Sequence, residues 1–258
     1  MTSPHMTSLA RALLLAAALA LTAQAAHAAQ TIGYSPAAQR VLTRARAAAG
    51  GAGWNMLRGW HEVGRRGGVR YEAWLDPLRY GLRVEVHDPT GLEVHGFNGA
   101  GEWRIRPTGE VTGVDVRGQR SAARTEAFFD IHGYFYPGRF DASADDLGVR
   151  TAHGRAYDVV RVKPWGGTAR ELWFDRRSHL LARMVDRNGP APVALAVSDY
   201  RKVGPVRVAF HLTPEDAASI QAPDREVESL DFGPADRARF SLPRPTAETA
   251  APPAPAGL

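Results

Sequence analysis

The sequence has 258 residues, a formal net charge of +5 at pH 7 and no cysteine. The lack of cysteine excludes disulfide bonds, thiolate metal sites and a lipid-modified N-terminal cysteine. Among the basic residues, the lysines are Lys163 and Lys202, and acidic residues are interspersed with the arginines almost everywhere. This pattern predicts a solvated surface of mixed charge and argues against a nucleic-acid partner, which needs a continuous basic patch.

Residues 1–28 are typical of a cleaved secretory signal peptide. Arg11 precedes the apolar run 12–21, and small residues follow, with Ala26 and Ala28 on either side of His27. The run is too short to span a bilayer, which takes about 20 apolar residues, so a retained anchor is the weaker interpretation. We therefore expect cleavage after Ala28 and a monomeric protein in the periplasm, or a secreted one, with no transmembrane span.

Helical signals occur at two places along the expected mature chain. In the first, Ser35 can cap a helix, Pro36 suits its first turn, and Gly50 and Gly51 end it. The second predicted helix covers 121–132. Aromatic residues gather in and just after this helix: Phe128, Phe129, Tyr134, Phe135 and Tyr136.

From Trp54 onward, apolar and polar residues alternate with the period of strands that bury one face. Turn-forming residues separate these segments, and Asp145 and Asp146 fall in a polar turn predicted at 141–146. The predicted strands are 68–76, 80–87, 91–97, 102–106, 147–152, 156–163, 168–174, 180–187, 193–200, 205–212 and 226–232.

Roughly ten strands and two helices predict a mainly β protein with one large antiparallel sheet. A sheet of this size must curve to bury its apolar face, and two helices cannot cover both faces. We therefore expect an incomplete, half-open barrel with the helices in its concave face. The expected domain spans 29–244, and the Pro- and Ala-rich tail 245–258 is expected to be disordered.

Candidate catalytic motifs fail the requirements of their chemistry. His61-Glu62 begins like a zinc-protease helix, but residue 65 is Arg and the segment is strand-like. The sequence contains no G-x-S-x-G elbow, and Asp88-Pro89-Thr90-Gly91 has one residue more than an aspartic-protease loop. The sequence therefore predicts a protein that is not an enzyme and has no catalytic residue, metal or cofactor. An enzyme with an unrecognised site remains the least favoured alternative.

Four segments resemble LolA-like periplasmic proteins, the superfamily of the outer-membrane lipoprotein carriers. Residues 171–185, ELWFDRRSHLLARMV, resemble the family's strand–turn–strand pattern WFD-x-x-[TS]-x-L-L-x-R. Residues 198–212 resemble the next hairpin, although Pro205 and Ala209 replace its turn Gly and its Pro. Residues 97–105, FNGAGEWRI, resemble an earlier turn, and 230–243 resemble the closing strand.

The resemblance implies an incomplete antiparallel barrel around helices, which agrees with the strand pattern. It also implies a non-enzymatic periplasmic carrier for an acyl chain, a lipid or an acylated protein, bound in an apolar cavity. Similar domains precede retropepsin-like catalytic domains in some periplasmic proteases, and this sequence has no Asp-Thr-Gly triplet. The alternative is therefore a sensor or interaction module that partners a separately encoded envelope protein, such as a protease.

An apolar cavity in such a fold would lie between the sheet and the helices. The alternative is that the same aromatic residues only fill a packed core, so an open cavity favours the carrier and a filled one favours the interaction module. The expected cavity walls are Tyr71, Leu75, Val84, Trp103, Leu172 and Phe174, and the expected lid residues are Phe128, Phe129 and Phe135.

Overall fold

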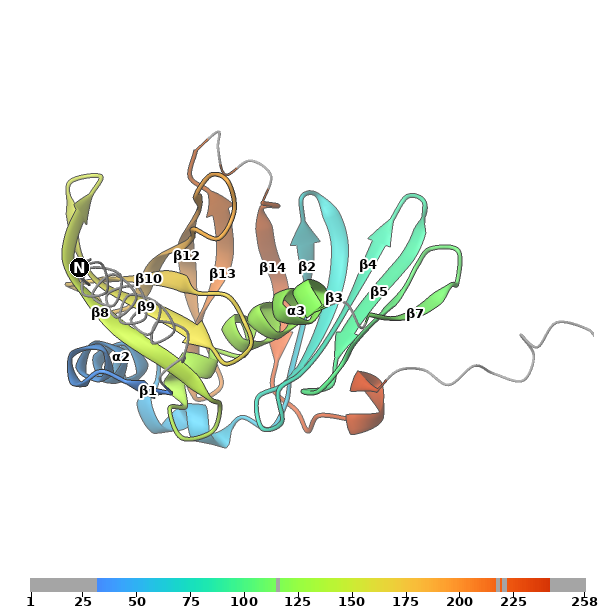
Figure 1. Cartoon of the computed structure of the whole chain (residues 1–258), viewed down its shortest axis with the longest axis horizontal. Coiled ribbons are helices and arrows are strands. Elements are labelled where there is room, and N and C mark those ends of the chain that lie inside the picture. Colours follow the sequence, from blue (N-terminus) through green and yellow to red (C-terminus); the bar gives the residue numbers. More distant parts are fainter. Residues whose placement is uncertain (1–31, 115–116, 217–218, 220–221, 242–258) are drawn as a thin grey trace, which may run out of the picture. The chain divides into compact units, whose positions relative to one another are not determined.

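The structure is a computed structural model that describes residues 32–114, 117–216, 219 and 222–241 (Figure 1). The predicted signal peptide 1–28 and the predicted tail 245–258 lie outside the described residues. Alternating apolar residues build most of the described chain into strands, as the period of two predicts. The strands are β1 (Gly33–Tyr34), β2 (Trp60–Arg66), β3 (Val69–Asp76), β4 (Gly81–Asp88), β5 (Gly91–Phe97), β6 (Glu102–Ile105), β7 (Val111–Val114), β8 (Ala142–Ala152), β9 (Arg155–Pro164), β10 (Arg170–Asp175), β11 (Leu181–Asp186), β12 (Val193–Val203), β13 (Val206–Pro214) and β14 (Arg225–Asp231).

Within the described residues, the fourteen strands form one sheet in the order β1-β8-β9-β10-β11-β12-β13-β14-β2-β3-β4-β5-β6-β7. The β1–β8 pair is parallel, and the other pairs are antiparallel. Bulges in β8, β11 and β14 add local bending and twist, which help a long sheet to curve. The sheet does not close on itself, which confirms the predicted incomplete barrel.

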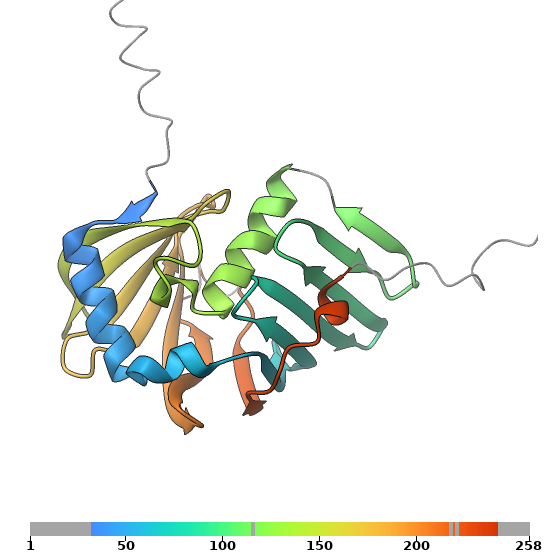
Figure 2. The same ribbon diagram turned by 90° about the horizontal axis from the view of Figure 1, so that it is seen from below.

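Two α-helices lie against this sheet in the described part, α2 (Pro36–Ala48) and α3 (Arg117–Asp130). The helix α2 starts where predicted, because the Ser35 side chain accepts a hydrogen bond from the Ala38 N–H and Pro36 takes the first turn. It packs against β8 and β9, whereas α3 packs against β5, β6 and β9. Figure 2 shows α3 between the strands β8–β13 and the strands β2–β7.

One apolar cluster connects both helices to the concave face of the sheet. Its helical members include Leu42 of α2 and Phe128 of α3, and its strand members come from both groups of strands. A smaller cluster on the other face contains Tyr157 and Trp173. The short 3-10 helices are η1 (Gly51–Met56), η2 (Gly133–Phe135) and η4 (Arg237–Phe240). The fold is therefore mainly β with two helices in the concave face, as predicted.

Several predicted boundaries are wrong. The segment predicted as a polar turn at 141–146 belongs to β8, where Ala142 and Ala144 are buried on alternate positions and Asp145 and Asp146 pair with Arg161 and Val160 of β9. Residues 51–56 form η1 instead of starting the strand pattern at Trp54. The second helix begins at Arg117 instead of 121. The predicted strands also omit β1, β2 and β7, of which β2 covers the segment around His61 that the sequence marks only as strand-like.

Candidate functional site

The last turn of α3 faces two different environments. The ring of Phe128 is fully buried, and it contacts the rings of Tyr80 and Phe140. The next residue, Phe129, has its ring 5.3 Å from that of Phe128 and nearly perpendicular to it. The guanidinium of Arg170, on β10, lies over the Phe129 ring at 4.8 Å. Consecutive aromatic residues of one helix therefore pack against a solid core and against a more open region.

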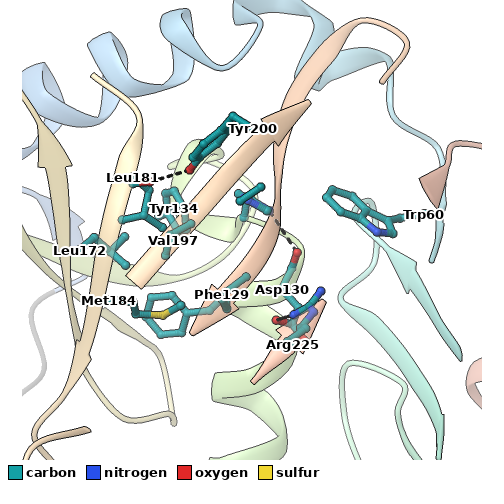
Figure 3. Close-up of a pocket in the computed structure, with 13 residues that line it drawn as sticks. Trp60, Phe129, Asp130, Tyr134, Leu172, Leu181, Met184, Val197, Tyr200 and Arg225 are labelled. Carbon is teal, nitrogen blue, oxygen red and sulfur yellow. Dashed lines mark hydrogen bonds and ion pairs between the residues drawn. The ribbon is translucent and has the colours of Figure 1, made fainter. Parts of the chain in front are cut away.

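The open region contains a small recess between α3 and the strands β10–β14 (Figure 3). It has a volume of about 50 Å³, which holds only a few atoms of a ligand. Most of its walls are aromatic or aliphatic. Its lining residues are Trp60, Phe129, Asp130, His132, Tyr134, Leu172, Leu181, Met184, Val197, Tyr200, Ala209, Leu212 and Arg225.

A larger groove, of about 520 Å³, adjoins the recess. The two share Asp130, Met184, Leu212 and Arg225, so the recess continues the groove toward the core. The groove is large enough for a small-molecule ligand, because such sites measure about 300–1,000 Å³. Its remaining lining residues are Arg66, Ala122, Thr125, Glu126, Thr168, Arg170, Asp186, Asn188, Gly189, Val193, Leu195, Ala222 and Pro223.

Arg225, on β14, is the centre of a buried polar cluster at the junction of groove and recess. Its guanidinium donates hydrogen bonds to the carboxylates of Glu62 and Asp130 and to the Tyr71 hydroxyl. Glu62 is 1% exposed and also accepts hydrogen bonds from the Tyr71 hydroxyl at 2.7 Å and from Trp60 Nε1 at 2.9 Å. The cluster connects β2, β3, β14 and α3, and its saturated hydrogen bonding makes a buried charge tolerable.

The electrostatics of this cluster follow from burial and from the shared cation. Burial alone would raise the pKa of Glu62, but Arg225 and the hydrogen bonds from Tyr71 and Trp60 outweigh it and lower that pKa. Burial raises the pKa of Asp130, and the neighbouring Glu126 adds to this rise, while Arg225 opposes it. Glu62 is therefore the carboxylate that holds its charge most firmly.

The groove pairs each of its arginines with an acid. Arg66 Nη1 lies 3.2 Å from Glu126, Arg225 Nη1 lies 3.1 Å from Asp130, and Arg170 Nε lies 3.7 Å from Asp186. The described lining therefore has no net formal charge. A polar but neutral mouth above an apolar recess suits a ligand with an apolar chain and a weakly charged or uncharged polar end.

His132 follows α3 and lines the recess in a left-handed backbone conformation, with φ 54°. Its ring stacks on Trp60 and lies 4.9 Å from the ring of Trp54. Burial lowers the pKa of His132 to about 4, an effect that outweighs the hydrogen bond to the Asp130 carbonyl. The imidazole is therefore neutral near pH 7 and acts as a flat aromatic wall.

The structure brings two of the sequence-predicted cavity residues to the recess, Phe129 and Leu172. Phe135 lines a separate pocket beside α2. The residues Tyr71, Leu75, Val84, Phe128 and Phe174 are at most 2% exposed and belong to the packed concave-face core, outside the groove and the recess.

Trp103 lies on the opposite face of the sheet from the other predicted residues. It pairs with Gly96 on β5, and a Cβ at Gly96 would lie only 2.3 Å from the indole. Its Nε1 donates a hydrogen bond to the Phe240 carbonyl at 2.9 Å, and Arg83 covers its ring. Trp103 therefore anchors the C-terminal segment against the convex face.

Sequence reasoning missed most of the recess. The missed lining residues on β11–β14 are Leu181, Met184, Val197, Tyr200, Ala209, Leu212 and Arg225. Apolar alternation along 193–200 and 205–212 marks some of them as inward-facing. That signal identifies a face of a strand, but it does not separate residues that line a groove from residues that fill a core.

One group of side chains in the described residues has the composition of a metal site. Ligand atoms of Glu72, Glu85 and His87 lie within 4.8 Å of one another on β3 and β4. Each carboxylate already has a partner, because Arg83 binds Glu85 at 2.7 Å and His61 binds Glu72 at 2.7 Å.

The described helices include none that is long and apolar enough to cross a membrane.

No protein-family model matches the sequence, and no curated protein matches it. Solved structures match in fold. A DUF1329 family protein from Desulfovibrio piger has 12% identity and a TM-score of 0.53, over 80% of this chain and 98% of that chain. A Vibrio parahaemolyticus domain assigned to outer membrane lipoprotein sorting has 13% identity and a TM-score of 0.47, over 75% and 91%. The Mycobacterium tuberculosis lipoprotein LppX has 12% identity and a TM-score of 0.29, over 63% and 93%. At these identities the likeness concerns the fold alone, and the match to the Desulfovibrio piger protein supports the fold predicted from the hairpin motifs.

Proposed function

We propose that this chain is a non-enzymatic binding protein of the periplasm that holds an acyl chain, of a lipid or an acylated protein, in the groove beside α3. The observation that carries the proposal is the groove of about 520 Å³ that continues into an apolar recess. A periplasmic location rests on the signal-like segment 1–28, which lies outside the described residues.

Burial of apolar surface supplies the affinity in this proposal. At about 25 cal/mol per Å², an acyl chain that buries ~200 Å² in the groove gains about 5 kcal/mol. Phe129 and Leu172 form part of the wall at the inner end, and the paired charges of Arg66 and Glu126 lie at the mouth. The balanced charges around the mouth favour a ligand whose polar end stays near water.

The first test is extraction of the purified protein followed by mass spectrometry, together with titration of a fluorescent long-chain fatty acid. We expect a co-purified lipid or saturable binding of the probe. Absence of both would contradict the proposal.

A groove-filling variant localises the binding. Met184 lies where groove and recess meet, so Met184→Trp should obstruct both and weaken probe binding about tenfold or more, which corresponds to about 1.4 kcal/mol. The matched control is Met56→Trp, because Met56 is 68% exposed and lines neither cavity. Equal affinity in the two variants would show that the probe binds elsewhere.

The second candidate function is an interaction module for another envelope protein. It is favoured by the tight packing between α3 and β3–β5, where Leu82, Val84 and Phe128 are fully buried and leave that side only its outer surface for binding. Crosslinking in the periplasm followed by pull-down tests it, and a partner whose capture is unaffected by Met184→Trp would support it over the carrier.

A further inference from the structure

A separate pocket of about 300 Å³ lies beside α2 and is distinct from the groove. Its walls come from β1, α2, η1 and η2, and it shares with the recess only Tyr134. Leu42, Tyr134 and Phe135 give it an apolar interior, while Arg46 and Asn55 give it a polar side. The volume is at the lower end of small-molecule sites, which suits a ligand of about one ring or a short chain.

The charge of this pocket differs from that of the groove. Among its described lining residues, Arg46 is the one charged side chain, and no carboxylate faces it. Arg46 Nη2 donates a hydrogen bond at 2.7 Å to the neutral Oδ1 of Asn55, and the guanidinium carbon lies 5.9 Å from the centre of the Tyr136 ring. These contacts hold the guanidinium in place without neutralising it.

Two donors of the pocket residues have no partner. Arg46 Nε and the Tyr34 hydroxyl are buried atoms without a hydrogen-bond partner in the described part of the chain. Buried polar atoms in proteins are nearly always hydrogen-bonded, so an orphan pair at one pocket requires an explanation.

From these features we propose that the α2 pocket binds a small organic anion, a monocarboxylate with an aromatic or short aliphatic body. An arginine guanidinium presents paired N–H donors that match the two oxygens of a carboxylate. Tyr34 also lines the pocket, and Leu42 and Phe135 form apolar wall for the body of the ligand. The proposal is independent of acyl-chain binding in the groove.

The test is isothermal titration of the purified protein with phenylacetate and with its neutral counterpart phenylacetamide. We expect phenylacetate to bind about tenfold or more tightly than the amide, because charge-assisted hydrogen bonds to arginine favour the anion. In backbone-amide NMR spectra, shifts should centre on residues 34–55 and 134–137. Equal affinity for the two probes, no binding of either, or shifts centred on residues 168–225 would each overturn the proposal.

Single substitutions test whether Arg46 and Tyr34 bind the anion. Arg46→Met keeps the aliphatic stem and should weaken phenylacetate binding about tenfold or more, whereas Arg40→Met, an exposed position on the same helix outside the pocket, should leave it unchanged. Tyr34→Phe removes only the hydroxyl and should weaken binding about threefold or more. Unchanged binding in both Arg46→Met and Tyr34→Phe would overturn the assignment, while Met184→Trp should leave phenylacetate binding intact even if it abolishes fatty-acid binding.

Discussion

The two sides of α3 face one continuous sheet but differ in packing. Toward β3–β5, Leu82, Val84 and Phe97 are at most 1% exposed and enclose Phe128 completely. Toward β10–β13, Met184 and Leu212 are only half-buried, and a groove of about 520 Å³ remains. The same fold therefore produces a solid core and an open groove, depending on which side chains face the helix. The groove is therefore a property of the side chains of one half and not of the barrel as such.

The two sides should differ most in how much stability is lost when a side chain is removed. Phe128→Ala should lower the free energy of unfolding by about 3–5 kcal/mol, because a fully buried ring leaves a cavity. Met184→Ala, at the groove, should cost about 1 kcal/mol, since the site is already open. Urea unfolding followed by circular dichroism measures both. Equal costs would mean that the two sides are packed alike.

The buried polar cluster should show the next largest effect. Glu62→Gln should cost about 2–3 kcal/mol, because the charged hydrogen bonds to Arg225 and Tyr71 weaken while Asp130 still pairs with Arg225. The matched control is Glu72→Gln on the convex face, where the Glu72 carboxylate is 26% exposed, and it should cost about 0–1 kcal/mol. A small loss of stability in Glu62→Gln would show that the Glu62 charge adds little to the stability of the fold.

Acid should destabilise the folded state through His132. Its pKa in the folded protein is about 4, below the value of about 6.5 in an unfolded chain, so the unfolded chain binds more protons between these values. Stability is therefore complete above about pH 6.5 and falls as the pH drops, by about 2 kcal/mol between pH 7 and pH 5. Urea unfolding across this range measures the loss.

The control for the pH effect is His132→Asn, which removes the titrating ring at a left-handed position that asparagine tolerates. This variant should be less stable at pH 7, but its stability should fall less steeply from pH 7 to pH 5. An unchanged slope would place the acid sensitivity in other groups.

The smallest expected changes in stability come from removing one of two tyrosine hydroxyls. Tyr71→Phe removes a hydroxyl that donates to Glu62 and accepts from Arg225, and it should cost about 1–2 kcal/mol. Tyr34→Phe removes a buried hydroxyl without a partner in the described residues, so the ligand-free protein should keep its stability or gain up to about 1 kcal/mol. Thermal unfolding of both variants measures this. A loss at Tyr34 equal to that at Tyr71 would reveal an internal partner for the Tyr34 hydroxyl.

Local signals predicted much of the fold. Ser35 and Pro36 placed the start of α2, and apolar alternation placed most strands, because caps and periodicity act over a few residues. The same signals failed at 141–146, where alanine alternation is too weakly apolar to outweigh the polar residues between them. They also missed β1, whose two residues pair with the distant strand β8.

The site was less predictable, because it depends on register and on contacts between distant segments. Phe97 and Trp103 are aromatic residues on adjacent strands, yet the register pairs Trp103 with Gly96 and places the two rings on opposite faces. The contact between Glu62 and Arg225 joins residues 163 positions apart. Neither fact has a local signature, so only Phe129 and Leu172 of the predicted residues line the recess.

The position of β14 in the sheet has a consequence for how the chain reaches this fold. β14 is the last strand of the described residues, yet it lies between β13 and β2 and joins the two groups of strands. The edges of both groups stay open until residues 225–231 are available. Folding that depends on such distant contacts is slow, because the entropy of closing long loops is lost before the contacts form. A newly made chain with this topology therefore spends longer unfolded, until its last strand can pair with both groups.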